Sequence, residues 1–254
     1  MAGRFFMLNA VASKNKLKET VKLQQKKYRE QTGLFIAEGS KILEEMLLKN
    51  VDIVEIFSLK ELNNDKIKCP VFIVDEAEMK KISSTESVCE LLVVAKKKTV
   101  DIKQFSKLNN IILLDSVSDP GNLGTIIRSA SAFGVEGIIL FGYCADLYSS
   151  KVIRSTAGNF FKIPVVSVNS VDELQKYFKN HVKIATALSK NNNITLKECA
   201  KINKRIIMFG SEASGLSYDL IKTADKNIRL EMRNSVDSLN LAVCASIIMY
   251  ETAI

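Results

Sequence analysis

An amide and a guanidinium, Asn122 and Arg128, lie in the stretch LLDSVSDPGNLGTIIRSASAFGVEGIILF, residues 113–141. Apolar runs at 111–114 and 138–141 predict two buried strands joined by a breaker-rich loop and a helix. Asn122 falls in the loop, and Arg128 falls opposite the apolar stripe of the helix. Open parallel sheets bind ligands beyond such strand ends, and a guanidinium grips phosphate with two hydrogen bonds. Taken alone, the pattern also describes a turn and a solvated arginine, which is the commoner case.

A second polar cluster follows another predicted strand in IIMFGSEASGLS, residues 206–217. The apolar run ends at Gly210, and Glu212 lies in a loop of small residues before a helix. Glycine at a strand end lets a ligand approach the backbone. Glu212 is equally explained as a carboxylate at a helix N-terminus.

A third cluster stands in LEMRNSVDSLNLAVCASIIMYE, residues 230–251. Ser238 is well placed to cap a helix that is apolar almost all round. Such a helix must be buried on most faces, within its domain or against a second subunit. Considered alone, Ser238 and Asn240 are explained by capping and core hydrogen bonding.

The three stretches together resemble the SpoU family of S-adenosylmethionine-dependent RNA 2'-O-ribose methyltransferases, the TrmH-like branch of the SPOUT superfamily. The resemblance runs from Ile111 to the C-terminus and includes RSTAGNFFKIPV, residues 154–165. It is weaker in the N-terminal part, where FIAEGSKILEEML looks like the L30e-like substrate-binding domain of members that act on ribosomal RNA. The implied fold is α/β, with a parallel sheet flanked by helices, a C-terminal trefoil knot and a homodimeric assembly.

The resemblance also implies roles for individual residues. Asn122 and Arg128 match residues that catalyse the reaction or position the RNA, and Glu212 matches the acid of the second motif. Ser238 and Asn240 match the polar pair of the third motif. The positions that match contacts to S-adenosylmethionine are Gly210, Leu230, Met232, Leu239, Ala187 and Leu188. No metal is implied.

The chain departs from the family pattern at two positions of the third motif. Glu231 and Asn234 stand where the family usually has proline and glycine. Asparagine tolerates a left-handed backbone better than most residues, so the loop is expected to form. Glu231 changes the local shape beside the implied cofactor site.

No obvious general base accompanies these motifs. The only histidine, His181, lies in a polar segment between a helix and a strand and is expected at the surface. Arginine stays protonated in proteins. The hypothesis is therefore that Arg128 grips a phosphate beside the target ribose, and that this phosphate or a water accepts the hydroxyl proton. Asn122 would hold the ribose or the arginine, and Glu212 would orient Arg128 or its own loop.

Composition limits the remaining possibilities. The 254 residues are 47% hydrophobic and carry a formal charge of +8, and residues 1–30 hold eight Lys or Arg against two Glu. This basic arm suits nucleic acid, although a solvated helix face is the simpler explanation of a charge run. The five cysteines show no CxxC pair, which argues against a zinc site or disulfide framework. No apolar run reaches 18 residues, so a cytoplasmic protein is expected, with no membrane partner.

The order of predicted elements indicates two α/β domains. A substrate-binding domain with the basic arm is expected at 1–95, a charged linker at 96–110 and a methyltransferase domain at 111–254. The expected strands are 33–39, 53–57, 71–74, 90–95, 111–114, 138–141, 163–168, 182–188, 205–210 and 227–232. The expected helices are 15–32, 40–50, 76–82, 149–156, 171–178, 195–200, 217–222 and one that begins at Ser238.

Structured RNA, ribosomal more than transfer RNA, is the expected substrate, because the N-terminal domain and basic arm suit a large RNA. Three alternatives stay open. They are a non-catalytic RNA-binding or assembly factor on the same fold, a transfer-RNA 2'-O-methyltransferase, and a base methyltransferase of the wider superfamily. A Rossmann dehydrogenase is excluded, because no GxGxxG follows a strand.

Overall fold

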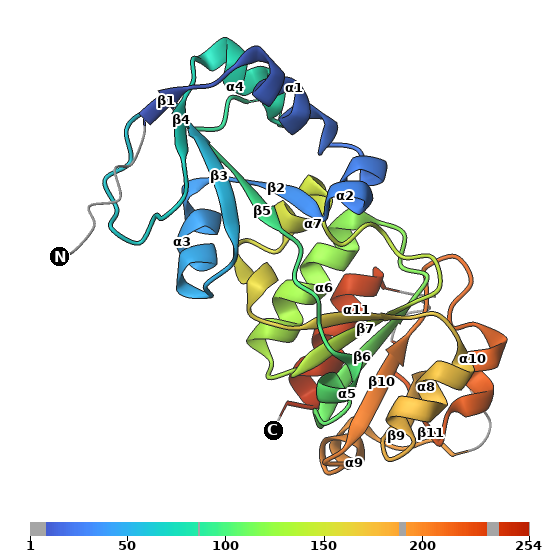
Figure 1. The fold of residues 1–254 in the computed structure, drawn as a ribbon. Coiled ribbons are helices and arrows are strands. Elements are labelled where there is room, and N and C mark those ends of the chain that lie inside the picture. Colours follow the sequence, from blue (N-terminus) through green and yellow to red (C-terminus); the bar gives the residue numbers. More distant parts are fainter. Residues whose placement is uncertain (1–8, 86, 188–191, 233–238, 254) are drawn as a thin grey trace. The chain divides into compact units, whose positions relative to one another are not determined.

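The computed structural model describes residues 9–85, 87–187, 192–232 and 239–253. The chain divides into two compact units, the first made of Met1–Lys98 and Tyr148–Phe161 and the second of Thr99–Leu147 and Lys162–Ile254. Figure 1 shows both units with their elements labelled. The segment Tyr148–Phe161, which the sequence analysis places in the C-terminal domain, belongs to the first unit, because its helix α7 (Ser150–Ser155) packs against strand β2 (Leu34–Glu38).

The first unit is built on a mixed five-stranded sheet with the order β1-β4-β3-β5-β2. Strand β5 runs antiparallel to both of its neighbours, whereas β4 runs parallel to β1 and β3. The other strands are β1 (Asn9–Val11), β3 (Ile53–Ser58), β4 (Val71–Ile73) and β5 (Leu91–Lys96). The helices are α1 (Lys14–Lys22), α2 (Lys26–Thr32), α3 (Ser40–Leu48) and α4 (Glu76–Ile82), and a 3-10 turn, η1, covers Asn159–Phe161.

The single helix expected at 15–32 is wrong, because the chain breaks between α1 and α2. Leu23 is buried in the core of the unit. The side-chain amide of Gln24 donates to the carbonyls of Ile82 and Ser83 at the end of α4, each at 3.0 Å. These tertiary contacts hold residues 23–25 in a turn, and no local pattern reveals them.

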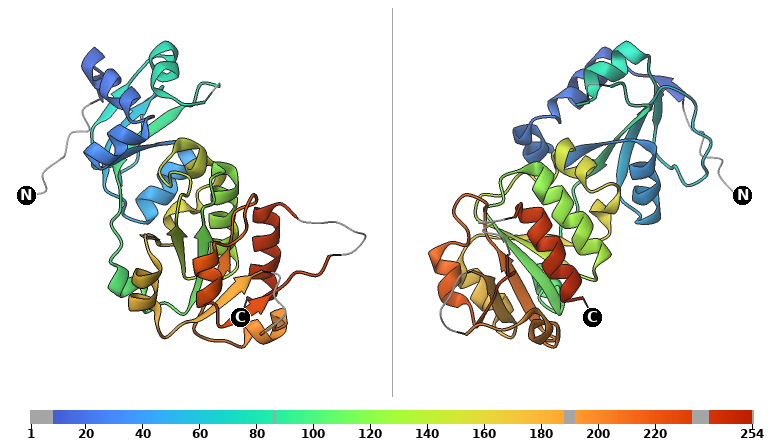
Figure 2. Two further views of the ribbon diagram at one scale, coloured as in Figure 1. Left: turned by 90° about the vertical axis from the view of Figure 1, so that its right-hand side faces the viewer. Right: turned by 180° about the vertical axis from the view of Figure 1, so that it is seen from behind.

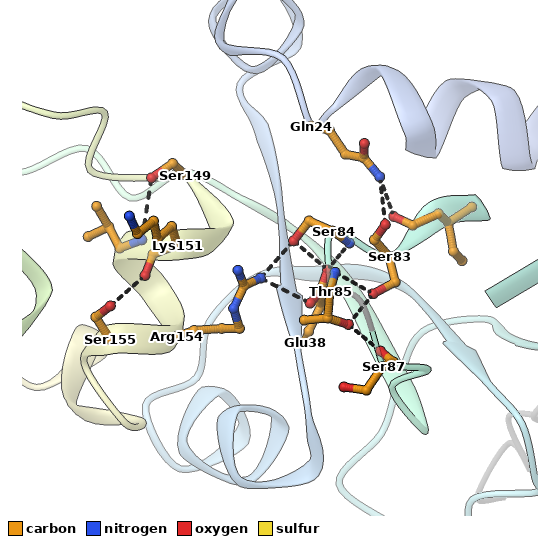
Figure 3. Close-up of polar contacts among 12 residues, drawn as sticks. Gln24, Glu38, Ser83, Ser84, Thr85, Ser87, Ser149, Lys151, Arg154 and Ser155 are labelled. Atoms are coloured by element: carbon orange, nitrogen blue, oxygen red, sulfur yellow. Dashed lines mark hydrogen bonds and ion pairs between the residues drawn. The ribbon is translucent and has the colours of Figure 1, made fainter. Parts of the chain in front are cut away.

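A buried carboxylate holds α7 in the first unit (Figure 3). The side chain of Glu38 is 2% exposed and accepts hydrogen bonds from Ser84, by the backbone N–H at 2.7 Å and the hydroxyl at 3.0 Å. Arg154 Nη1 lies 3.2 Å from Glu38 Oε2 and donates to Ser84 Oγ at 2.7 Å. An unpaired buried charge is strongly destabilising, so this pairing ties the Tyr148–Phe161 segment to β2.

The described strands of the second unit form a six-stranded, fully parallel sheet with the order β11-β9-β10-β6-β7-β8. The strands are β6 (Asn110–Asp115), β7 (Gly137–Phe141), β8 (Val165–Val168), β9 (Val182–Thr186), β10 (Arg205–Phe209) and β11 (Lys226–Ile228). The central strands are mostly apolar and buried, as expected for a parallel sheet covered on both faces. The predicted α/β class is confirmed.

Helices cover both faces of this sheet (Figures 1 and 2). One core cluster joins the sheet to α5 (Ile102–Phe105), α8 (Val171–Phe178) and α10 (Tyr218–Thr223). On the other face, α6 (Pro120–Ala132) packs against α11 (Leu241–Glu251), and α11 also packs against α9 (Leu196–Ala200). None of the helices in the described ranges is long and apolar enough to cross a membrane.

Two expectations for the end of the chain are wrong. The N-cap of α11 is Asn240, whose side-chain oxygen accepts from the N–H groups of Ala242 and Val243, and not Ser238. Ser238 lies outside the described residues. The strand expected at 227–232 is β11 and ends at Ile228. It pairs with β9 on one side, and on its other side Asn227 forms an isolated bridge with Asn193.

The sole histidine is buried and not at the surface as expected. His181 is 3% exposed, and its Nε2 lies 2.8 Å from the carbonyl oxygen of Leu108. The connection between α5 and β6 covers it, although its neighbours in sequence are polar. Burial lowers the pKa of the imidazole, and Lys204 and Lys183 add to this effect.

The free energy of unfolding is predicted to fall at low pH, because His181 takes up a proton more readily in the unfolded chain than in the folded protein. The pKa of His181 is lower in the folded protein than in the unfolded chain, where it is about 6.5. The contribution of the neutral imidazole to the free energy of unfolding is therefore complete above that pH and is lost as the pH falls below it. His181→Gln keeps a donor for Leu108 but cannot titrate. Denaturant unfolding at pH values on either side of about 6.5 should show a smaller pH dependence for the variant than for the wild type. Equal pH dependence would contradict this role.

Candidate active site

The carboxyl ends of β6 and β10 form the point where the strand order reverses. From β6 the chain proceeds outward through β7 and β8, and it then returns to build β9, β10 and β11 on the other side. Ligands of open α/β sheets bind in the crevice at such a switch point. Asn122 follows β6 on the first turn of α6, and Glu212 follows β10, so the sheet brings these two sequence motifs together.

A chain of hydrogen bonds joins the three motifs. Asn122 Nδ2 donates to Glu212 Oε1, and Asn240 Nδ2 donates to Asn122 Oδ1 at 3.0 Å. The three residues come from the loop after β10, the start of α6 and the start of α11. Residues up to 118 positions apart in sequence therefore share one polar cluster.

The two helix caps determine how the amides are oriented. Asn240 Oδ1 is occupied by the N–H groups of Ala242 at 2.9 Å and Val243 at 3.3 Å, so its Nδ2 faces Asn122. The backbone N–H of Asn122 is held by the N-cap of α6, Asp119, at 2.7 Å. With its Oδ1 accepting from Asn240, the Nδ2 of Asn122 must face the carboxylate. The second N–H of each amide and Glu212 Oε2 have no partner among the described residues, so they are available to a ligand.

Arg128 lies on the exposed side of α6, as the apolar periodicity predicts. In the described part of the chain, its guanidinium contacts neither Asn122 nor Glu212. The carboxylate of Glu212 is engaged by Asn122 instead. The proposed pairing of Arg128 with Glu212 stays a prediction. The Arg128 side chain is exposed, so a phosphate can reach its guanidinium.

The loop after β10 is folded back so tightly that Gly210 is required. A Cβ atom at this position would lie 1.9 Å from the carbonyl carbon of Gly215 and 2.0 Å from the nitrogen of Leu216. Ser211 and Gly215 close the loop with two backbone hydrogen bonds, at 3.1 and 2.9 Å, and Gly215 has a φ of +65°. The space beside Gly210 is thus filled by the protein's own backbone. The role of Gly210 as a cofactor contact stays a prediction.

The other residues implied to contact the cofactor follow the neighbouring strand ends. Ala187 follows β9, Leu230 and Met232 follow β11, and these three side chains are half-buried. Leu239, just before α11, is 36% exposed. Leu188, like Ser238, lies outside the described residues. Among the residues that the structure describes, no cluster of His, Cys, Asp and Glu suits a metal ion.

Asp115 belongs to none of the sequence motifs, yet it holds the site loops together. This residue ends β6 and is 3% exposed. Its Oδ2 accepts from the backbone N–H of Ser217 at 2.7 Å, and its Oδ1 accepts from the hydroxyl of Ser116 at 2.9 Å. The carboxylate therefore links the loop after β6 to the loop after β10. An acid placed directly after four apolar residues was the available signal.

Comparison with known proteins identifies the family. The model of the SpoU rRNA Methylase family matches residues 109–250, and that of the MRM3-like substrate binding domain matches residues 14–92. The chain belongs to the SpoU rRNA methylase family, and it is a methyltransferase of the kind that acts on RNA.

Particular relatives resemble nearly the whole chain. It is 30% identical over 246 residues to the 23S rRNA (guanosine(2553)-2'-O)-methyltransferase RlmP of Bacillus subtilis. This alignment covers 94% of this chain and 96% of the relative. The AdoMet-bound rRNA methyltransferase of Sinorhizobium meliloti aligns over 96% of both chains with 28% identity and a TM-score of 0.87. The SpoU methyltransferase AviRb of Streptomyces viridochromogenes, at 22% identity, covers 95% of this chain and 97% of its own and shares the fold with a TM-score of 0.85.

Two glycine variants test the geometry of the loop after β10. Gly215→Ala should cost about 1–2 kcal/mol, because its left-handed backbone is strained for alanine but the space beside it is open. Gly210→Ala should cost clearly more, because the new methyl group would overlap backbone that cannot rotate away. Denaturant unfolding of both variants measures the difference. A Gly210→Ala variant as stable as Gly215→Ala would show that the loop is not folded back in this way.

Proposed function

We propose that this protein transfers a methyl group from S-adenosylmethionine to the 2'-hydroxyl of a ribose in ribosomal RNA. The observation that carries the proposal is the chain of hydrogen bonds Glu212–Asn122–Asn240 at the switch point of the sheet, in a member of the SpoU rRNA methylase family. Relatives named as 2'-O-methyltransferases of 23S rRNA support the reaction and the substrate.

The residues at the strand ends fit an adenosyl group. Leu230 and Met232 expose part of their apolar surface beside β11, and Leu239 adds a third apolar side chain from the start of α11. Pockets for such ligands are mostly apolar, with a few polar groups that set the orientation. We assign these three side chains and the backbone near Ala187, Leu188 and Gly210 to cofactor binding. The bound cofactor supplies an electrophilic sulfonium methyl.

The protein's own residues contribute mainly alignment. Asn122 and Asn240 each keep one N–H free to hold the ribose, and Glu212 orients Asn122. Arg128 binds a phosphate next to the target ribose. That phosphate or a water accepts the hydroxyl proton as the 2'-oxygen bonds to the methyl carbon, whose bond to the sulfonium sulfur breaks and leaves a neutral thioether. Ser238, with Asn240, completes the contacts to the hydroxyl and the cofactor. Holding reactants in a near-attack geometry supplies about 7–11 kcal/mol.

The first unit is assigned to RNA binding, since it contains the match to a substrate-binding domain. Within α1 and α2, Lys16 pairs with Glu55 at 2.6 Å and the buried Arg29 donates to the carbonyl of Leu23 at 2.7 Å. Lys26 makes a longer ion pair with Glu30, at 3.7 Å, in which both side chains are exposed. The exposed cations of this region are Lys14, Lys18, Lys22, Lys26 and Lys27. These five lysines can meet phosphates, and Arg4 of the predicted basic arm lies outside the described residues.

The proposal includes a homodimer and a trefoil knot, as the family resemblance implies. Helix α11 supports the dimer, because two of its large side chains, Val243 and Tyr250, are 48% and 64% exposed on a largely apolar helix. A second copy of α11 would cover this face. A cytoplasmic location is part of the same proposal.

The decisive experiment maps 2'-O-methyl groups on total RNA from cells with and without this protein. Loss of one ribosomal mark supports the proposal. Loss of a transfer-RNA mark or of a base methyl group would favour the corresponding alternative enzyme. No lost mark, together with no heat of binding to S-adenosylmethionine, would favour an assembly factor without catalysis.

Arg128→Lys tests the gripping role of the guanidinium. Lysine keeps the charge but loses the bidentate geometry, so methyl transfer should fall at least about tenfold, while calorimetry shows unchanged affinity for S-adenosylmethionine. Arg128→Ala should be at least as impaired as the lysine variant. Wild-type rates from Arg128→Lys would refute the assignment.

Replacing the five exposed lysines of α1 and α2 with glutamine tests RNA binding by the first unit. Each lost phosphate contact should reduce the slope of log affinity against log salt by about 0.7–0.9. A matched variant replaces the exposed Lys107, Lys176, Lys179, Lys197 and Lys201 of the second unit. Filter binding at several salt concentrations should show a reduced slope for the first variant only. An equal slope for both variants would contradict the assignment.

A further inference from the structure

The loop after β7 presents an exposed aromatic ring beside the catalytic loop. In the sheet, Phe141 at the end of β7 pairs in register with Asp115 at the end of β6. Tyr143 comes two residues later and is 79% exposed. It is the most exposed aromatic residue among those that the structure describes, and no ring or hydrogen-bond partner contacts it in the described part of the chain.

The loop that carries Tyr143 is hydrogen-bonded to the loop after β6, which leads to Asn122. The N–H of Ala145 donates to the carbonyl of Val117 at 2.8 Å, and the N–H of Ser116 donates to Phe141 at 2.9 Å. Gly142 has a φ of +65°, and a Cβ there would lie 2.5 Å from the hydroxyl of Ser116. A bulky residue is therefore excluded at 142, and the backbone that carries Tyr143 is held in place before any ligand binds.

Tyr143 lies on the side of β6 opposite the residues assigned to the cofactor. The methyl acceptor can bind on that side. The residues assigned to the cofactor follow β9, β10 and β11, which lie on one side of β6, whereas Tyr143 follows β7 on the other side. Neighbouring strands are about 4.8 Å apart. The ring thus lies close to the site. An RNA strand that places one ribose at Asn122 must continue past this position.

We propose that Tyr143 is a stacking platform for an unpaired base next to the methylated nucleotide. Sequence-specific proteins commonly splay out bases of single-stranded RNA and stack them on aromatic rings. A tyrosine on a fixed backbone offers such a surface with a small loss of side-chain entropy, because only two side-chain torsions must be ordered. The inference rests on the proposed function. Tyr218, which is 69% exposed at the start of α10, is a poorer candidate, because Lys222 Nζ already lies 4.2 Å from its ring centroid.

Kinetics with ribosomal RNA as methyl acceptor give the first test. Tyr143→Ala should raise the KM for RNA by about tenfold to a hundredfold, the range expected for one base–aromatic stack. The kcat and the affinity for S-adenosylmethionine should not change, and Tyr143→Phe should behave as the wild type because it keeps the ring. A wild-type KM for Tyr143→Ala would overturn the proposal. So would an altered molecular mass in solution with an unchanged KM, which would assign the ring to a protein contact.

A fluorescence measurement separates this inference from the enzymatic assignment. The chain contains no tryptophan, so Tyr143→Trp introduces a single indole at the proposed platform. A short single-stranded oligoribonucleotide of mixed sequence should quench its emission. Asn203→Trp places an indole at an exposed position just before β10, at the end of the strands opposite the site, and its emission should not be quenched. Quenching at 143 without any methyl transfer would reject the proposed reaction alone, whereas methyl transfer without quenching at 143 would reject the platform alone.

Discussion

The site depends on one constraint: two asparagine amides and one carboxylate must face each other in a single orientation. An amide has one acceptor and one donor end. The cap of α11 uses the acceptor end of the Asn240 amide. Asn240 must therefore donate to Asn122, and Asn122 must in turn donate to Glu212. Helix capping and site organisation are therefore the same interaction in this protein. A substitution at Asn240 affects both.

The parallel sheet makes that constraint possible. Its strands deliver the loops after β6 and β10 to adjacent positions, and Asp115 then fastens the two loops through Ser116 and Ser217. The close approach of Gly215 to Gly210 keeps the second loop short, so that Glu212 stays beside the sheet edge. Rigid elements under a site hold its side chains more accurately than loops alone. The buried scaffold thus supports groups that are themselves exposed.

Much of this arrangement was predictable because the signals are local. The apolar strands, the helix after Asp119 and the outward position of Arg128 follow from periodicity and breakers. The failures involve contacts between distant segments. His181 has polar neighbours in sequence but is covered by the α5–β6 connection, and the 23–25 break depends on the end of α4. Ser238 and Asn240 are both good caps by residue type, so sequence alone could not choose between them.

The same limit applies to the site. The motifs and their order suggested a common location, but their hydrogen-bond partners could not be derived, because side-chain direction depends on the tertiary fold. Glu212 was expected to orient Arg128 or its own loop, and the structure pairs it with Asn122 instead. The predicted strand ended at residue 114, and the role of Asp115 emerges only when the loop after β10 is placed against it.

The most direct test of the account is a double-mutant cycle between Asn122 and Glu212 with methyl transfer as the readout. Residues that act as one unit give strongly non-additive losses. Asn122→Ala combined with Glu212→Ala should therefore be about as slow as the worse single variant. If the two losses in activation free energy simply add, the residues act independently, and the hydrogen-bonded cluster is not the basis of the site.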